Sequence, residues 1–160
     1  MTISLRTARA ADRDTVVDLI QVLNAHEAAL TGDRRRDRAA ASGYYDDLQR
    51  RLAQREGRVV LAEADRRVVA AMGFCIDEDA AYMAEDVRRH GTVTDLVVHE
   101  EWRGRGIARL VLVEAERLTR EAGLRRLVIG ALVANQKAER TYRAFGFEPY
   151  VSILVKPLEP

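Results

Sequence analysis

The sequence predicts an α/β fold, with one domain over residues 1–160 built on a mixed β-sheet. Residues 58–76 contain two apolar, strand-like runs joined by a short turn, which is typical of an antiparallel hairpin. Further along, strand, helix and strand patterns follow one another, and such a unit must place its two strands parallel. The chain contains no repeat or linker, and its 160 residues suit one core.

The N-terminal third predicts one strand and two helices. Residues 3–9 alternate as a strand does, and Asp12 is a suitable N-cap for the helix that follows, whose apolar residues recur with helical period. Gly32 ends this helix. A second, more polar helix is expected over residues 38–54, with Gly57 closing it.

The middle of the chain predicts the hairpin and a third strand. Residues 58–64 and 67–76 are its two strands, joined at Asp65 and Arg66. Residues 77–90 lack clear periodicity and are expected to form a loop with at most a helical turn. An apolar run over residues 92–98 predicts the next strand.

The C-terminal part predicts two more helix–strand pairs. A helix follows the glycine-rich turn after residue 98 and ends near Gly123, and residues 124–132 then form a buried strand. A helix over residues 136–145 and a last strand over residues 150–155 complete the fold.

Composition narrows the class of protein. With 26 basic and 25 acidic residues the net charge is +1, so no global field favours nucleic acid. No apolar run approaches the roughly 18 residues of a membrane span, and the first residues lack a signal peptide's apolar region. We expect a cytoplasmic protein without a nucleic-acid or membrane partner and without a bound metal.

Two local features have ordinary structural interpretations. The arginine cluster consists of Arg34, Arg35, Arg36 and Arg38. Because Asp33 and Asp37 flank it, a solvated surface is favoured over an RNA site. Cys75 is the only cysteine, which excludes an internal disulfide. Because it lies in an apolar run, a buried thiol is favoured over a nucleophile.

The turn between Val98 and the following helix predicts an anion pocket. Backbone N–H groups at a helix N-terminus point into such a turn, and glycine lets the backbone approach a phosphate closely. A dinucleotide-binding motif is excluded because Arg109 stands where the third glycine should be, and a Walker A motif because Gly-Lys-Ser/Thr is absent. What remains is Arg-x-x-Gly-x-Ala, from Arg103 to Ala108.

A second motif lies downstream, where Asn135 is followed by Tyr142 and then by Gly146-Phe147. Together the two motifs resemble the cofactor core of the GNAT superfamily of acetyl-CoA-dependent N-acetyltransferases. The resemblance is strong over residues 92–147 and weak before Val59. It implies a GNAT fold, a mixed sheet with helices on both faces, and acetyl-CoA (coenzyme A) as cofactor.

The resemblance also assigns cofactor-binding residues. In that family the strand before the loop bulges and opens a slot for the pantetheine arm, and one of its backbone N–H groups meets the oxyanion. Asn135 is expected to contact pantetheine or to cap the helix after it. The expected cofactor-binding residues are Leu96, Val97, Val98, Arg103, Gly104, Arg105, Gly106, Ile107, Ala108, Asn135 and Tyr142.

Acetyl transfer needs an acid for the leaving thiolate and a base for the amine. Tyr142 matches the family's general acid, because a phenol with a pKa near 10 stays protonated at neutral pH. Two candidates for the base are left open, Asp95 and Glu27 with its neighbour His26. Gly130 stands near the place where peptide-acetylating relatives have a glutamate, which counts against a peptide acceptor.

The expected acceptor is a small primary amine, attacked directly in a ternary complex. Alternatives are a protein or peptide N-acyltransferase and a non-catalytic acyl-CoA-binding module. Dimers are common in the family, and apolar positions of the last strand would serve a homodimer. The first two helices and the loop between the third and fourth strands carry several carboxylates, which could attract a cationic amine or merely balance the many arginines. They are Glu27, Asp46, Asp47, Asp77, Glu78, Asp79, Glu85 and Asp86, with Tyr44 and Tyr45 beside them.

Overall fold

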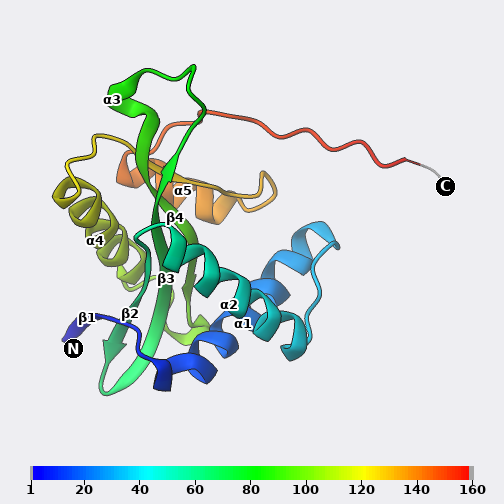
Figure 1. Cartoon of the computed structure of the whole chain (residues 1–160). Helices are drawn as coiled ribbons and strands as arrows, with labels where there is room; N and C mark the ends of the chain where they lie inside the picture. The colour runs from blue at the N-terminus through cyan, green and yellow to red at the C-terminus, as the bar shows by residue number, and fades with distance from the viewer. Residues whose placement is uncertain (1, 159–160) are drawn as a thin grey trace.

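A five-stranded sheet in the order β1-β2-β3-β4-β5 forms the centre of the computed structural model, which describes residues 2–158 (Figure 1). Strands β1 to β4 are antiparallel neighbours, whereas β5 pairs parallel with β4, so the predicted mixed sheet is confirmed. In chain order the elements are β1 (Ile3–Thr7), η1 (Ala10–Asp12), α1 (Arg13–Thr31), α2 (Arg38–Gln54), β2 (Arg58–Ala64), β3 (Arg67–Glu78), α3 (Glu85–Arg88), β4 (Arg89–Val98), η2 (Glu100–Trp102), α4 (Ile107–Glu121), β5 (Leu127–Ile129) and α5 (Gln136–Phe145).

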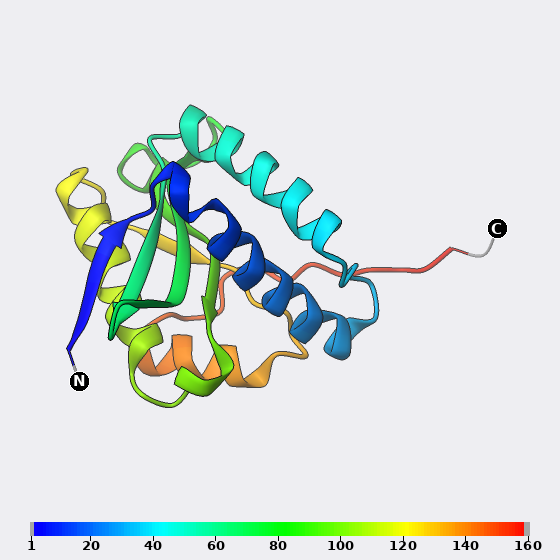
Figure 2. The same ribbon diagram turned by 90° about the horizontal axis from the view of Figure 1, so that it is seen from below.

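Helices α1 and α2 form a hairpin that covers one face of the sheet (Figure 2). Their apolar stripes, which include Val17 and Leu48, pack against Leu61 and Cys75 of the strands, all four being buried. None of the helices within residues 2–158 is long and apolar enough to cross a membrane.

Helices α4 and α5 cover the opposite face. Ile107 and Leu112 of α4 are buried against Met72 and Phe74 of β3, and the aromatic residues of α5 pack at the edge of this second cluster. The prediction of helices on both faces is therefore confirmed, and two apolar layers enclose the strands.

Two predicted helix ends differ in detail. Asp12 occupies the N-cap position of α1, but its carboxylate accepts from Arg6 and from the Arg9 backbone N–H instead of from the helix. Helix α2 has the predicted bounds, yet the left-handed residue after it is Glu56, with φ of 52°. Gly57 is required for space: a Cβ there would lie 2.8 Å from the Leu52 side chain.

The predicted loop over residues 77–90 is shorter than expected. Strand β3 continues to Glu78 and β4 begins at Arg89, and these two residues pair across the hairpin. The charged end of this hairpin is largely exposed, so it carries little of the apolar alternation that identifies a strand in a sequence. Helix α3 forms the predicted helical turn between them.

The prediction of a buried strand over residues 124–132 is only partly right. Strand β5 covers Leu127–Ile129 and is half-buried, because β4 is its one partner strand within the described chain. The prediction of a strand over residues 150–155 is wrong, since these residues are extended, exposed and unpaired. Figures 1 and 2 both show this C-terminal segment leaving the body of the molecule.

Candidate active site

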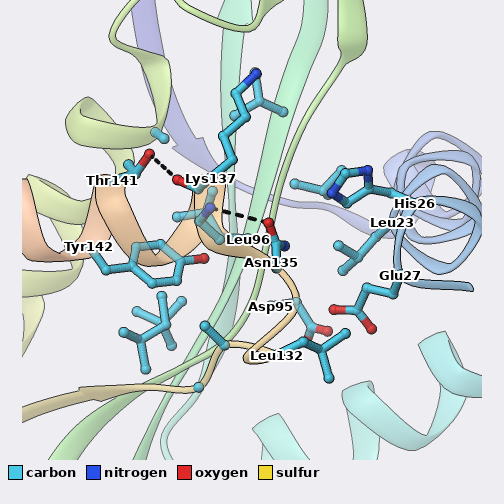
Figure 3. Close-up of a pocket in the computed structure, with 18 of the residues that line it drawn as sticks. Leu23, His26, Glu27, Asp95, Leu96, Leu132, Asn135, Lys137, Thr141 and Tyr142 are labelled. Carbon is cyan, nitrogen blue, oxygen red and sulfur yellow. Dashed lines mark hydrogen bonds between the residues drawn. The ribbon is translucent and has the colours of Figure 1, made fainter. Parts of the chain in front are cut away.

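A pocket opens where β4 and β5 diverge. The two strands are paired only from Gly91 with Leu127 to Val93 with Ile129, and β4 continues to Val98 without this partner. The pocket lies in the resulting slot, between α1 on one side and α5 on the other (Figure 3). Its lining residues are Leu23, His26, Glu27, Val93, Thr94, Asp95, Leu96, Val97, Val98, Arg103, Ala108, Ile129, Gly130, Ala131, Leu132, Asn135, Lys137, Ala138, Thr141 and Tyr142.

A β-bulge in β4 accounts for the divergence. Gly73 pairs with Asp95 and Phe74 with Val93, so Thr94 is an extra residue on β4. Gly73 makes this possible, because a Cβ at that position would lie 2.1 Å from Thr94 Oγ1. The bulge increases the local bend of β4 and carries its last residues away from β5. Residues 94–98 therefore present backbone groups to the slot, as the resemblance implied.

The turn between β4 and α4 has the geometry of an anion site. Gly104 and Gly106 both adopt φ of +77°, which only glycine takes without strain, and no atom would obstruct a Cβ at either position. The first helical hydrogen bond joins the Leu110 N–H to the Gly106 carbonyl, and no side chain caps α4. The earlier amides and the positive end of the helix dipole are thus directed at the turn.

Side chains around this turn are held by neighbours. Arg103 lines the pocket and its Nε donates to the Val98 carbonyl at 3.1 Å. The guanidinium of Arg105 lies 4.8 Å from the centre of the Trp102 ring. Ile107 is buried in the α4 layer, so only its backbone can face a ligand. Phosphate binding by the backbone of residues 103–108 stays a prediction that this geometry fits.

Tyr142 projects from α5 into the slot, and its hydroxyl points toward the side formed by α1 (Figure 3). Its ring packs edge-on against Phe147, with 6.1 Å between centroids. Burial, together with the negative charges of Glu27 and Asp95, raises the pKa of Tyr142 to about 12. The phenol therefore carries its proton at neutral pH.

Asp95 lies in the bulged part of β4 and lines the pocket. The hydroxyl of Tyr44, from α2, lies 2.9 Å from both carboxylate oxygens and donates to them. Burial raises the pKa of Asp95, and the Tyr44 hydrogen bond opposes that rise. Asp95 is thus a half-buried carboxylate held in one orientation by a residue of a second element.

Glu27 enters the pocket from α1, beside His26 and Leu23 (Figure 3). Its Oε2 accepts a hydrogen bond of 3.0 Å from Arg34 Nε in the α1–α2 connection. The structure therefore brings together Tyr142, Asp95 and Glu27, the three predicted catalytic residues, around a single pocket. Asn135 lines it as well, and its side chain caps α5 by accepting from the Ala138 N–H at 3.2 Å.

The predicted acidic rim is not assembled around the pocket. Of its carboxylates only Glu27 lines the pocket, while Tyr45 is buried in the α1–α2 layer. Most of the others are neutralised by arginines on the surface, which is the alternative that the sequence had left open. The ion-paired members are Asp46, Asp47, Asp77, Glu78, Asp79 and Glu85.

The structure agrees with a solvated arginine cluster and with a buried, unreactive Cys75 thiol. In the arginine cluster, Arg34 pairs with Asp33 and Arg35 with Asp37, and Arg38 pairs with carboxylates of α1. Cys75 is fully buried in the α1–α2 layer, and burial raises the pKa of its thiol, the opposite of what a nucleophile needs.

Sequence reasoning missed two features of the pocket. Tyr44 was expected only as part of a rim, yet it is the residue that orients Asp95. Its partner is 51 residues away, so nothing local in the sequence indicates the contact. Lys137, near the start of α5, lines the pocket and adds a cation to it. Lys137 follows Asn135 by two residues at the start of this helix, and that spacing could have indicated that its side chain lies near Asn135.

Comparison with known proteins agrees with this geometry. The profile of the Acetyltransferase (GNAT) family matches residues 21–147. An aminoglycoside N(6')-acetyltransferase type 1 from Stenotrophomonas maltophilia is 31% identical over 118 residues, which cover 72% of this chain and 76% of the relative. The tetramutant of the BH1408 protein from Bacillus halodurans has a similar structure, with a TM-score of 0.80, 19% identity and coverage of 97% of this chain and 99% of that one. The aminoglycoside N-acetyltransferase AAC(6')-Iy in complex with CoA has a TM-score of 0.72 at 15% identity, and the match covers 99% of this chain and 96% of that one.

Proposed function

This chain belongs to the GNAT family of acetyltransferases and uses acetyl-CoA, and we propose that it acetylates a primary amine of an aminoglycoside-like polyamine by direct attack. One observation carries the proposal: Tyr142 and the carboxylates of Asp95 and Glu27 line the same slot between diverging strands. An acid for the leaving group and a base for the attacking amine are therefore available on opposite sides of one site.

The turn at Gly104 and Gly106 would hold the pyrophosphate of the cofactor through its backbone amides. The exposed backbone of β4 over Leu96–Val98 would pair with the amides of the pantetheine arm, as an added strand pairs with a sheet edge. In this position one β4 N–H stabilises the negative charge that develops on the carbonyl oxygen when the amine attacks.

Tyr142 acts as the general acid in this proposal. As the carbon–sulfur bond breaks, its hydroxyl donates a proton to the sulfur, which would otherwise leave as a thiolate with a pKa near 8.5. The raised pKa of Tyr142 keeps that proton available at neutral pH. Its half-buried ring is held by Phe147, which fixes the direction of the hydroxyl.

Asp95 is the better candidate for the base. It is half-buried and its hydrogen-bond partner is the neutral phenol of Tyr44, whereas Glu27 is paired with the guanidinium of Arg34. An alkylammonium must lose a proton before it attacks, and a buried carboxylate with a raised pKa is a stronger base than an exposed one. Glu27 would then bind a second ammonium of the acceptor, which favours a polyamine over a simple monoamine.

The acceptor class is supported by the aminoglycoside N(6')-acetyltransferase relative at 31% identity. Aminoglycosides carry several ammonium groups on one rigid frame, and two carboxylates in the pocket suit two of them. Direct attack is favoured over a covalent acetyl-enzyme because Cys75 is buried away from the pocket, so the one thiol of the chain cannot take part.

The test is acetyl-CoA-dependent thiol release with a panel of amines. An aminoglycoside with a 6'-amine is compared with one that has a 6'-hydroxyl, and with a linear polyamine, amino acids and a short peptide. We expect turnover with the 6'-amine and none with the 6'-hydroxyl. Turnover confined to the peptide would replace this proposal with protein acylation, and tight cofactor binding without turnover on any amine would indicate a binding module.

The Tyr142→Phe variant tests the mechanism in the same assay. Loss of the phenolic proton is expected to lower kcat at least ~10-fold, within the range of general acid catalysis, while the Kd for acetyl-CoA stays nearly unchanged. The Kd is measured by calorimetry in parallel. An unchanged kcat would show that another group protonates the sulfur.

A further inference from the structure

Lysine is scarce in this chain, and one of its two lysines lies in the active-site slot. The sequence has 26 lysines and arginines together, of which only Lys137 and Lys156 are lysines. A guanidinium stays protonated in proteins and does not act as a nucleophile, whereas a lysine amine can lose a proton and be acylated. The slot that is proposed to hold an acetyl thioester is therefore lined by one of the two lysine amines of the chain.

Lys137 belongs to the same wall of the slot as Tyr142. Both residues belong to α5, and five positions separate them, which corresponds to about 7.5 Å along a helix axis. In the proposed complex the sulfur of the thioester lies beside the Tyr142 hydroxyl, and the carbonyl carbon is bonded to that sulfur. The flexible four-carbon stem of Lys137 spans a comparable distance, so it can bring the amine to this carbon.

No partner holds the ammonium of Lys137 in place. Its backbone carbonyl accepts a hydrogen bond of 3.0 Å from Thr141 Oγ1 (Figure 3). Within residues 2–158, however, its ammonium forms neither a hydrogen bond nor an ion pair. Figure 3 shows the side chain extending away from Asp95 and Glu27, so neither carboxylate fixes it. The residue is also exposed, so water can take a proton from its amine.

Lys156 lies in a different environment. It is exposed in the C-terminal segment after α5, and it is not among the described residues that line the slot. Because its amine is the same chemical group, any reaction with acetyl-CoA in free solution affects Lys156 as well. The chain thus contains an internal reference, a lysine that meets only dissolved acetyl-CoA.

We propose that the enzyme acetylates its own Lys137 when acetyl-CoA is bound and no amine acceptor is present. The inference rests on the proposed acetyl transfer in this slot but not on the class of acceptor. The Lys137 ammonium gives one proton to water, and its neutral Nζ attacks the carbonyl carbon of the thioester. The carbon–nitrogen bond forms, the carbon–sulfur bond breaks, and the sulfur takes the proton of Tyr142 and leaves as coenzyme A. The nitrogen then gives up a second proton, which restores the Tyr142 phenol and leaves an uncharged amide.

The first test is incubation of the purified chain with acetyl-CoA and no added amine, followed by mass spectrometry of its peptides. Lys137 is expected to gain an acetyl group at least ~10-fold faster than Lys156, because the bound donor is held close to it. Its rate constant should not depend on protein concentration, since the transfer occurs within one copy. A Lys137 that stays unmodified, or that reacts no faster than Lys156, would overturn the proposal, and so would a rate constant proportional to protein concentration.

The second test shows whether the bound donor reacts. Excess free coenzyme A fills the slot without an acetyl group, so it should suppress acetylation of Lys137 and leave the background at Lys156 unchanged. Lys137→Arg retains the cation without an amine that can be acylated, and its intact mass should show the background alone. Lys156→Arg is the matched control and should be acetylated at Lys137 as the unmodified chain is. Acetylation of Lys137 that coenzyme A does not suppress would mean reaction with dissolved donor and would refute self-acetylation.

The amine panel separates this inference from the proposed function. Turnover of a panel amine by a chain whose Lys137 stays unmodified would overturn self-acetylation alone. Absence of both reactions in a chain that binds acetyl-CoA would overturn acetyl transfer itself. Acetylated Lys137 without turnover of any panel amine would support self-acetylation and remove the proposed acceptor.

Discussion

A carboxylate inside a protein stays charged only where neighbouring donors replace the water it has lost. At Asp95 the donor is Tyr44, which reaches across from α2 to within 2.9 Å of both oxygens. Burial raises the pKa of Asp95, and this hydrogen bond limits the rise. The pair sets the pH at which the proposed base becomes available.

Replacing Tyr44 by phenylalanine should therefore change the pH profile of the reaction. Without the hydroxyl the Asp95 carboxylate is less stable, its pKa rises further, and the acid limb of kcat/KM moves to higher pH. Activity on the alkaline side, where Asp95 is ionised in both proteins, should change much less. The measurement is kcat/KM against pH for the best amine of the panel.

Tyr45→Phe is the matched control, because Tyr45 follows Tyr44 on α2 but packs in the apolar layer. Its profile should superimpose on that of the unmodified enzyme. If Tyr44→Phe also leaves the acid limb in place, Asp95 is not the group that titrates in that limb.

At this scale the sequence indicated the residue types but not their contacts. Tyr142 and Asn135 could be selected because their spacing matches a known motif. The Tyr44–Asp95 pair joins residues 51 positions apart, and only the packing of α2 over the sheet brings them together. The choice between an acidic rim and carboxylates that balance arginines stayed open for the same reason, since the sequence does not show that most of these carboxylates pair with arginines.

Helix α4 has a left-handed glycine at each end, and only the N-terminal one faces the proposed cofactor site. Gly106 has φ of +77° and Gly123 has φ of +72°, and neither has an atom within 4 Å of a built Cβ. The cost of an alanine is therefore purely conformational at both positions, about 1–2 kcal/mol. The two glycines form a matched pair for separating stability from binding.

Gly106→Ala and Gly123→Ala should each lower Tm by a few degrees, in proportion to that cost. Only Gly106→Ala should also weaken acetyl-CoA binding, by about tenfold or more, because it moves the amides that face the phosphates. Thermal unfolding and calorimetric titration give the two quantities. Equal affinities for both variants would mean that the cofactor phosphates bind elsewhere.

Arg6 of β1 joins three elements near the N-terminus. Its guanidinium pairs with Asp12, before α1, at 2.7 Å and with Glu63 of β2 at 2.6 Å. The hydrogen bonds that Asp12 accepts from Arg6 and from the Arg9 backbone N–H lower its pKa to about 2, below its ordinary value of 3.8. The carboxylate thus adds stability above its unfolded pKa, and this contribution disappears as the pH falls through 2.

Asp12→Asn should accordingly lower Tm at neutral pH. The difference from the unmodified chain should shrink from about pH 4, where Asp12 of the unfolded state begins to bind a proton, down to about pH 2, where the native carboxyl binds one as well. Tm is followed by circular dichroism across that range. A difference that stays constant down to pH 2 would show that the loss comes from packing and not from charge.

Elements with strong periodicity and clear end signals were predictable, and α2 and α5 have the predicted bounds. The length of the β3–β4 hairpin was underestimated because its outer residue pairs are charged. The prediction of a last strand was wrong for a different reason. Residues 150–155 have the composition of a strand, but a strand also needs a neighbour to bond with, and that neighbour is not specified by the segment itself.

The whole molecule is one sheet between two apolar layers, which predicts a single unfolding transition for the domain. Leu61 lies in the α1–α2 layer and Leu112 in the α4–α5 layer, and both are fully buried. Each truncation to alanine should cost about 2–5 kcal/mol of unfolding free energy. Because the sheet separates them, the double variant should lose the sum to within about 0.5 kcal/mol.

Urea unfolding followed by fluorescence and by circular dichroism gives the three free energies. Coincident curves would support one cooperative unit over residues 1–160. Two separable transitions, each sensitive to one of the leucines, would instead divide the chain into two folding units.

The separation of β4 and β5 predicts a link between this protein's lifetime and its supply of cofactor. A parallel pair that stops after three residues leaves backbone groups that the pantetheine arm would complete in the proposed complex, so the liganded protein would have a fuller sheet than the free one. Mass action turns that difference into stability: at a ligand concentration a hundred times Kd the folded state gains about 2.7 kcal/mol. A cell depleted of acetyl-CoA would thus hold an enzyme that is idle and also easier to degrade.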